Sequence, residues 1–516
     1  MKQSGVFILQ YISSIFIALL CTVFLLAFPP GGYAVMAEFK YILFLAICGG
    51  YVALIIIIRI QTALIGIQPI GDIRDIGKNI RNVDLAVKLL LLFLFFVTVS
   101  ALLSEYQGTF RGAFRQEGVL TIAIYVLMCI FLSKYFRPQR WMLFVLGGST
   151  VLYCLLSFVQ LTGLNPFLLY PQGFNYYGAD IYYSGRFLGT IGNVGLGGGF
   201  LSIIVGVFAM SLIKFEFAKK WLLVIPFFMA VLLIFEMRVD AALLALAVGF
   251  LLMLPVAVSS AAALLRTLIV TAVMAAAFML SQVLVFYDGG LGLATPHPVI
   301  ALAVLLLIII TVFAAKYDVK ISASWLRNCA VGFVVVVLCL SLFYVWSFGD
   351  RHSGMIFEAS EIMHGQWSDE FGTWRVYIWR NVIEGIEAEN LLFGTGPDTL
   401  GFWDTEPFIW HDPLMGTTHD VTIDTAHNEY LQILATGGLL SLLAYLGVLI
   451  YIAIQWFSRP DNALLAVSGA GVLFYCIQAF FGISMFISAP FFWTCLAVVI
   501  YSLNSEKKHL IGGFDK

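Results

Sequence analysis

His427 and Asn428 stand directly before an apolar stretch, residues 430–457, that is long enough to cross a membrane as a helix. A histidine side chain has an ordinary pKa of about 6.5, so it can accept a proton at neutral pH. This position predicts a general base at a membrane surface. The alternative is a histidine that caps the helix or lies at the interface without chemistry.

Three arginines have the chemistry of an anion site. Arg186 precedes a glycine-rich stretch, where a guanidinium fork and a helix N-terminus together suit an anion, although the glycines also suit simple helix packing. Arg238 lies between two apolar stretches and either pairs with Glu236 or Asp240 or directs its charge toward phosphate. Arg375 lies on a predicted helix within a long polar segment, where a single charge is ordinarily solvated.

Together, these arginines and the histidine suit an anionic, lipid-linked substrate such as a polyprenyl diphosphate. Guanidinium groups can stabilise charge on the diphosphate leaving group. The imidazole can deprotonate an acceptor hydroxyl, which then attacks the anomeric carbon. This scheme requires no metal and no other cofactor. The segment that ends at His427 also contains Asp412, His419, Asp420 and Asp424, and these leave a metal-dependent oligosaccharyltransferase as an alternative.

The composition places these residues in a membrane protein. Of the 516 residues, 61% are hydrophobic and 11% are charged, whereas a soluble domain has about 25% charged residues. We expect an all-α polytopic membrane protein with about fourteen transmembrane helices, in a range of 12–14. The expected spans are 6–28, 40–58, 86–103, 118–133, 141–161, 190–213, 220–236, 239–256, 263–286, 298–315, 328–347, 430–457, 462–482 and 488–503.

Basic residues orient these spans. With the N-terminus in the cytoplasm, 20 of the 28 Lys and Arg residues fall in cytoplasmic loops and tails, so we expect both termini there. The net charge of −2 gives no basic surface for nucleic acid, and the eight cysteines form neither a disulfide framework nor a metal motif. Eight basic residues remain on the outer side, and each needs a reason: Lys40, Arg111, Arg115, Arg186, Arg238, Arg351, Arg375 and Arg380.

The spacing of the spans predicts three regions. Residues 1–347 form a bundle of about eleven helices, 348–429 form an extracytoplasmic loop or cap, and 430–516 form three helices and a cytoplasmic tail. The loop contains five of the seven histidines, and its tryptophans favour a packed cap over disorder. A second outer gap, 162–187, is rich in tyrosine, which suits either an interfacial belt or stacking on sugars.

The stretch "HNEYLQILATGGLLSLLAYL" resembles the bacterial O-antigen ligase superfamily, whose pattern is His-Asn, an aromatic residue, Leu, and a Gly pair that opens a span. Three other segments are similar to family motifs in the same order. They are the helix with Arg375 and Trp379 before the turn at 394–396, the stretch from Arg186 to Asn193, and the segment around Arg238. The last departs from the pattern because larger residues flank the arginine.

The resemblance implies a GT-C-like membrane glycosyltransferase in the bacterial cytoplasmic membrane. It would transfer a glycan from undecaprenyl pyrophosphate to a lipid or glycan acceptor at the outer face. The site residues implied are catalytic His427, diphosphate-binding Arg186, Arg238 and Arg375, and supporting Asn193, Asn428 and Tyr430.

Two other functions stay open. One is an O-antigen or exopolysaccharide polymerase of the same superfamily, which shares these motifs. The other is a lipid-linked sugar transporter, which is disfavoured because the predicted spans have almost no charged residues at their centres.

Overall fold

The computed structural model describes residues 2–64, 84–178, 185–316, 322–388, 390–405, 407–411 and 418–512. Within them, eleven helices are long and apolar enough to cross a membrane, and three shorter apolar helices accompany these. Each of the fourteen predicted spans falls on one of these helices. The chain is therefore a polytopic helical membrane protein, as its composition predicts.

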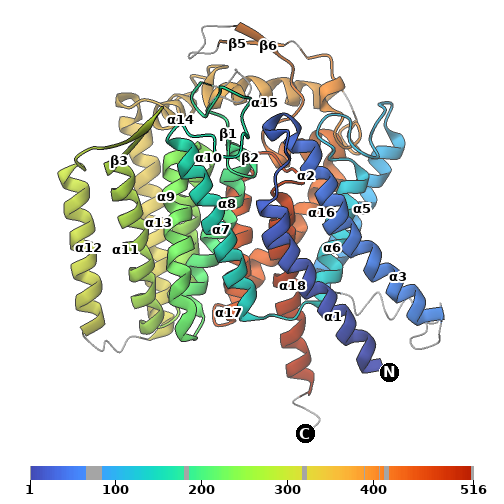
Figure 1. The fold of residues 1–516 in the computed structure, drawn as a ribbon, viewed down its shortest axis with the longest axis horizontal. Helices are drawn as coiled ribbons and strands as arrows, with labels where there is room; N and C mark the ends of the chain where they lie inside the picture. Colours follow the sequence, from blue (N-terminus) through green and yellow to red (C-terminus); the bar gives the residue numbers. More distant parts are fainter. Residues whose placement is uncertain are drawn as a thin grey trace.

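The helices stand side by side in one bundle (Figure 1). One end of the bundle bears α14, α15 and the pair β5–β6, and we call it the cap end; both termini lie at the other, the terminal end. The helices are α1 (Lys2–Leu19), α2 (Met36–Phe44), α3 (Gly50–Leu64), α5 (Leu85–Leu103), α6 (Val119–Tyr135), α7 (Arg140–Leu161), α8 (Val194–Lys214), α9 (Val224–Met237), α10 (Asp240–Ala257), α11 (Ala261–Val283), α12 (Pro298–Lys316), α13 (Ala323–Phe348), α14 (Met355–Met363), α15 (Phe371–Ala388), α16 (Glu429–Ser458), α17 (Ala463–Gln478) and α18 (Ala489–Gly512).

Three antiparallel two-stranded pairs and several short helical turns complete the described fold. The π-helical turns η1 (Leu20–Phe24) and η3 (Leu45–Gly49) continue α1 and α2, and the 3₁₀ turn η5 (Ala218–Leu223) precedes α9. The strand pairs are β1 (Phe187–Leu188) with β2 (Gly192–Asn193), β3 (Leu284–Tyr287) with β4 (Gly290–Leu293), and β5 (Phe408–His411) with β6 (Thr418–Val421).

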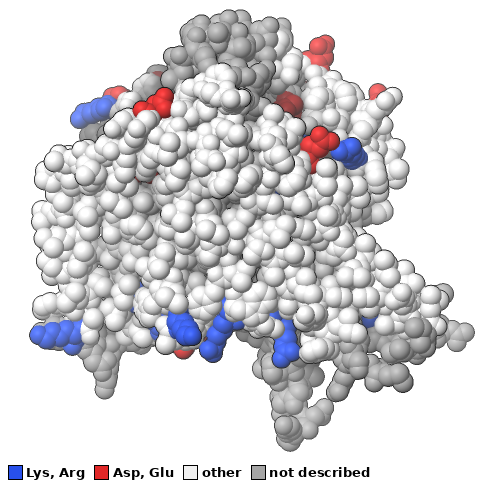
Figure 2. Space-filling model, in the orientation of Figure 1, with Lys and Arg blue, Asp and Glu red and all other residues white. Residues whose placement is uncertain are grey.

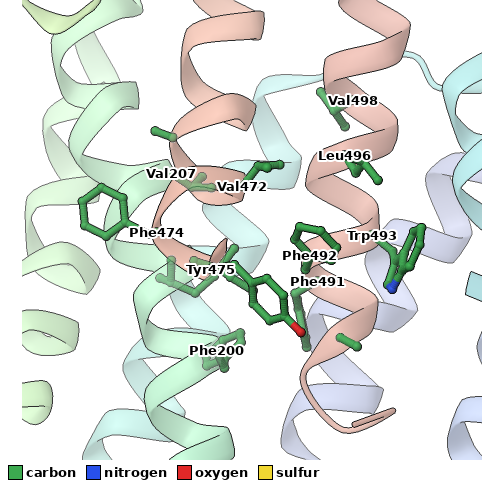
Figure 3. Close-up of a cluster of buried hydrophobic side chains, with 14 of the residues drawn as sticks. Phe200, Val207, Val472, Phe474, Tyr475, Phe491, Phe492, Trp493, Leu496 and Val498 are labelled. Carbon is green, nitrogen blue, oxygen red and sulfur yellow. The ribbon is translucent and has the colours of Figure 1, made fainter. Parts of the chain in front are cut away.

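Helix α8 is the centre of the bundle. It is apolar on all sides because neighbouring helices cover it completely. Phe200 on α8 packs against Phe491 on α18 with ring centroids 4.8 Å apart, and Tyr475 on α17 stacks on Phe492 at 4.2 Å (Figure 3). A Cβ at Gly206 would lie 2.7 Å from the carbonyl oxygen of Ala470, so glycine is what lets α8 and α17 approach so closely.

The cap is anchored on the first turns of α16. Ile378, Val382 and Ile386 of α15 form a small core with Trp403 and Ala426, together with other apolar residues on both sides. These α15 positions follow helical spacing, so one face of the helix is buried against the chain that leads into α16. The packing therefore fixes the segment that contains His427.

Charge is distributed unequally between the two ends. On the face shown in Figure 2, most Lys and Arg side chains lie along the terminal end, and most Asp and Glu side chains lie toward the cap end. Such an imbalance of basic residues is the usual signature of orientation in a membrane.

Candidate active site

His427 occupies the junction between the cap and α16. Its backbone has a φ of +47°, a left-handed conformation that is uncommon for residues other than glycine. The next residue, Asn428, caps α16, because its side-chain oxygen accepts a 3.0 Å hydrogen bond from the N–H of Leu431. The capping alternative for His427 is therefore wrong: Asn428 is the cap.

Helix α15 holds both sides of this junction. The indole N–H of Trp379 donates to the carbonyl of Ala426 at 2.9 Å. Four residues earlier, and so on the same helical face, Arg375 donates from Nε to the carbonyl of Phe481 at 3.2 Å. The ring of Trp379 also packs against Phe481, with centroids 5.9 Å apart. One face of α15 thus ties the histidine segment to the connection between α17 and α18.

A second cation reaches the site from the connection between α5 and α6. Arg115 forms an ion pair with Asp424, with Nη2 and Oδ1 2.9 Å apart. The backbone N–H groups of Phe114 and Arg115 donate to Asp398 at 3.0 and 2.7 Å. These hydrogen bonds hold the backbone from which the Arg115 side chain extends. The Nε of Arg115 is buried and has no hydrogen-bond partner among the described residues.

Burial and neighbouring charges together determine the state of the imidazole. The pKa of His427 is lowered to about 3, chiefly by removal from water and then by the positive charges of Arg115 and Arg375, whereas Asp424 opposes this shift. Burial also lowers the pKa of Arg375, while Asp240 and Glu358 act to raise it. The structure therefore gathers His427, Arg115 and Arg375 within electrostatic range, with the imidazole neutral at pH 7.

Arg238 lies at the edge of this group. It ends α9 in a left-handed conformation, with a φ of +52°, and its side chain is exposed. Among the described residues it forms no ion pair within 4.0 Å, although its charge does act on Glu236 over a longer distance. Asp240, two residues later, begins α10, and its negative charge interacts with Arg375. Arg238 is thus linked through Asp240 to the group of His427, Arg115 and Arg375.

Tyr176 lies between Arg186 and Arg238, because it interacts with the charge of one and with the backbone beside the other. Burial, with a contribution from Tyr177, raises the pKa of Tyr176 to about 12, and the nearby charge of Arg238 opposes that rise. The carbonyl of Tyr176 accepts a 2.8 Å hydrogen bond from the N–H of Gly185, the residue before Arg186. Arg375 thus acts electrostatically on His427, whereas Arg238 and Arg186 are related to the histidine only through intermediate residues.

The three supporting residues have structural contacts. Asn193 caps α8 by accepting hydrogen bonds from the N–H groups of Gly195 and Leu196, at 2.8 and 3.2 Å. The Tyr430 hydroxyl donates to the carbonyl of Cys476 at 2.8 Å and so links α16 to α17. Asn193 and Asn428 set where helices α8 and α16 begin, and each helix begins beside a predicted site residue.

Beside the histidine segment is a polar cavity of about 90 Å³. Its lining includes Arg115 and four carboxylic side chains: Glu117, Asp398, Asp424 and Glu429. Glu429, in the first turn of α16, accepts hydrogen bonds from the hydroxyls of Tyr445 and Tyr475, both at 2.7 Å. Burial raises the pKa of Glu117 well above its ordinary range, and the nearby Asp398 and Glu429 raise it further. A polar pocket of this kind is unusual inside an apolar bundle and favours a functional site.

Strained backbone also concentrates here. Seven described residues other than glycine have a positive φ, and six of them are members or sequence neighbours of this group. Left-handed conformations at such residues cost energy and persist where the surrounding structure holds them, often at functional sites. The six are Gln116, Arg238, Thr373, Trp374, Asp398 and His427.

The metal alternative falls partly outside the described residues. Asp412 is not described, and neither are the side chains of His419 and Asp420. Within the described part of the chain, no three His, Cys, Asp or Glu side chains are grouped so that they could hold a metal ion.

Part of the chain is similar to a known protein family. Residues 291–446 match the family described as O-antigen ligase. This segment contains Arg375, Trp379 and His427, whereas Arg115, Arg186 and Arg238 precede it. A search of curated proteins finds no match to the chain.

Proposed function

We propose that this chain is a ligase-type glycosyltransferase, because residues 291–446 match the O-antigen ligase family and the chain is a multi-span membrane protein. It moves a glycan from undecaprenyl pyrophosphate to an acceptor hydroxyl. The observation that carries the proposal is the position of His427, at the foot of a membrane helix and within electrostatic range of two guanidinium groups. A neutral imidazole beside fixed cations suits a base that works next to a diphosphate.

The orientation of the chain belongs to the same proposal. Basic side chains gather at the terminal end (Figure 2), which supports placing that end in the cytoplasm and the cap end outside the bacterial cytoplasmic membrane. Residues 1–347 then form the first part of a GT-C-like bundle, 348–429 the extracytoplasmic cap, and 430–516 the last three helices and the tail. The diphosphate of a lipid carrier reaches the level of His427 while its tail stays in lipid.

In this mechanism His427 accepts the proton of the acceptor hydroxyl as its oxygen attacks the anomeric carbon. The new carbon–oxygen bond forms while the bond from that carbon to the diphosphate breaks, and undecaprenyl pyrophosphate leaves with both electrons. Arg375, with Arg238 and Arg186, stabilises the negative charge that grows on the leaving diphosphate. In this proposal each step is assigned to a protein side chain, and none is assigned to a metal.

We add Arg115 to the proposed diphosphate site. Its Nε is a buried donor without a partner among the described residues, and an incoming phosphate oxygen would satisfy it. A bound diphosphate would also offset the two guanidinium charges that depress the pKa of His427. That pKa then rises when the donor binds, which makes the imidazole a stronger base in the loaded enzyme.

The direct test uses purified protein, an undecaprenyl-pyrophosphate-linked glycan and a lipid acceptor. We expect His427→Asn to fold and to transfer glycan about a thousandfold more slowly, in line with the usual contribution of general base catalysis. Full activity of this variant would overturn the assignment. Mass spectrometry of the surface glycans of a gene-deletion strain then separates the two family activities. Loss of glycan attachment would indicate a ligase, and loss of chain length would indicate a polymerase.

A further inference from the structure

A larger cavity lies in the terminal half of the bundle, and it shares no lining residue with the cavity beside His427. Its volume is about 520 Å³. It is bordered by α1, η1, α7, α8, α17 and α18, and by the short segments that precede α7 and follow α8. Val207, Phe491 and Val498, which are labelled in Figure 3, contribute to its wall. The walls deeper in the bundle are almost entirely apolar, so the space suits hydrocarbon.

The depth of the cavity corresponds to one membrane leaflet. Along α8 its lining reaches Ile203, which is eleven residues from Lys214 at the terminal end of the helix. At 1.5 Å per residue this distance is about 16 Å, or roughly half of the hydrocarbon thickness of a bilayer. A methylene group occupies about 30 Å³, similar to a water molecule in the liquid. The cavity volume therefore corresponds to roughly seventeen methylene groups. These dimensions fit one acyl chain.

The mouth of the cavity carries positive charge. Arg140 contributes to the lining, and its guanidinium lies over the ring of Phe217, 5.1 Å from the centroid. No anionic partner of Arg140 occurs among the described residues. Glu216, the one acidic residue in the lining, is already paired with Arg266 at 2.6 Å. Lys214 and Lys220 flank the segment that contains Glu216, but they donate to the Ser259 hydroxyl and the Phe215 carbonyl. Arg140 is therefore the cation of the lining that is placed to meet a phosphate.

We propose that this cavity binds one anionic phospholipid from the leaflet at the terminal end. One acyl chain fills the space between α7, α8, α17 and α18, and the lipid phosphate lies against Arg140. This site is separate from the proposed catalytic site and does not depend on the proposed function. The bound lipid would fill a gap that side chains leave in the bundle, and so would stabilise the folded protein.

The test is native mass spectrometry of the full chain in mild detergent, with phosphatidylglycerol or phosphatidylcholine of identical acyl chains. We expect one phosphatidylglycerol to be retained per chain and to raise the Tm. Leu143→Trp fills the cavity from α7, and Leu464→Trp fills it from α17; either should abolish retention and the Tm shift. The matched control is Leu152→Trp, because Leu152 is on α7, is exposed and does not line the cavity.

A second pair of variants tests the charge. Arg140→Gln should weaken phosphatidylglycerol binding about fivefold and leave phosphatidylcholine binding unchanged. Arg137→Gln, in the segment just before α7 and outside the lining, should have a smaller effect. Equal retention of the two lipids, equal retention by Leu143→Trp and Leu152→Trp, or no retained phospholipid would each overturn the proposal. Because the two filling variants lie on different helices, α7 and α17, misfolding of one leaves the other to decide.

Discussion

The indole nitrogen of Trp379 lies 2.9 Å from the carbonyl oxygen of Ala426, the residue before His427. This hydrogen bond joins α15 in the cap to the backbone that positions the proposed base. The same helical face carries Arg375, so one rigid element fixes the imidazole and a guanidinium relative to each other. Such fixed geometry is what a transfer reaction needs from its site.

Replacing Trp379 with phenylalanine should therefore slow transfer while keeping the fold. Phenylalanine retains the ring but cannot donate the hydrogen bond, which costs about 1 kcal/mol of unfolding free energy. Because the backbone at His427 is in a strained left-handed conformation, we expect it to relax, and kcat to fall about tenfold with little change in KM. Steady-state kinetics with purified protein measure this split.

Trp367→Phe is the control for that variant. Trp367 lies in the same cap, but its side chain is 65% exposed, so its replacement should leave both kcat and Tm nearly unchanged. Equal kinetics of Trp379→Phe and wild type would show that the hydrogen bond does not position the base.

A different effect is expected from Arg115→Gln. The ion pair between Arg115 and Asp424 is partly exposed, so its loss should change the unfolding free energy by about 1 kcal/mol or less. Removing the guanidinium should, however, let the pKa of His427 rise, because Arg115 is one of the charges that depress it. The acid limb of the pH profile of kcat/KM should then move to higher pH, and activity should fall as the diphosphate loses a contact.

Arg111→Gln serves as the matched variant, because Arg111 lies in the same loop and its guanidinium stacks over the ring of Tyr41. Arg111 is not among the charges that act on His427. The acid limb of the pH profile of kcat/KM for Arg111→Gln should therefore coincide with that of wild type. An unshifted limb in Arg115→Gln would argue that the two side chains are electrostatically independent.

Gly438→Ala tests how the cap is docked on α16. Gly438 has a φ of +80°, and a Cβ there would lie 2.3 Å from the carbonyl oxygen of Leu392. We expect the unfolding free energy to fall by about 3 kcal/mol, from backbone strain and this clash together. Gly148→Ala is the control in thermal unfolding, because a Cβ on that α7 glycine meets nothing within 4 Å and should be neutral or slightly stabilising.

Much of the fold was predictable because each membrane span requires a long run of apolar residues, which can be seen directly in the sequence. The helix pair α9 and α10 shows this well: they are separated only by Arg238 and Val239, yet length alone divides the stretch into two spans. The position of His427 at the foot of α16 was predictable for the same reason, since a polar segment meets a span there. The helix that carries Arg375 was predictable from its spacing, although the contact of Arg375 with Phe481 was not.

Arg115 was not predictable as a member of the site. The only signal in the sequence was its place among eight basic residues on the predicted outer side. Its partner Asp424 lies 309 positions later in the chain, and no local pattern specifies a contact of that range. The connection between α17 and α18 was missed for a similar reason. It looks like a short apolar loop, yet its backbone accepts hydrogen bonds from Arg375 and Glu429 and donates one to Glu117.

The depressed pKa of His427 also makes stability depend on pH. In the unfolded chain this histidine has a pKa of about 6.5, whereas in the folded protein it is about 3. Between these values the unfolded state binds the proton and the folded state does not, so stability falls as pH drops from 6.5 toward 3. Asparagine cannot take up this proton and tolerates a positive φ, so His427→Asn removes this part of the acid sensitivity.

We expect the Tm of wild type to fall further than that of His427→Asn between pH 7.5 and pH 4.5, as measured by thermal unfolding in detergent. The reverse order, or parallel curves, would mean that the folded protein protonates His427 as readily as the unfolded chain does.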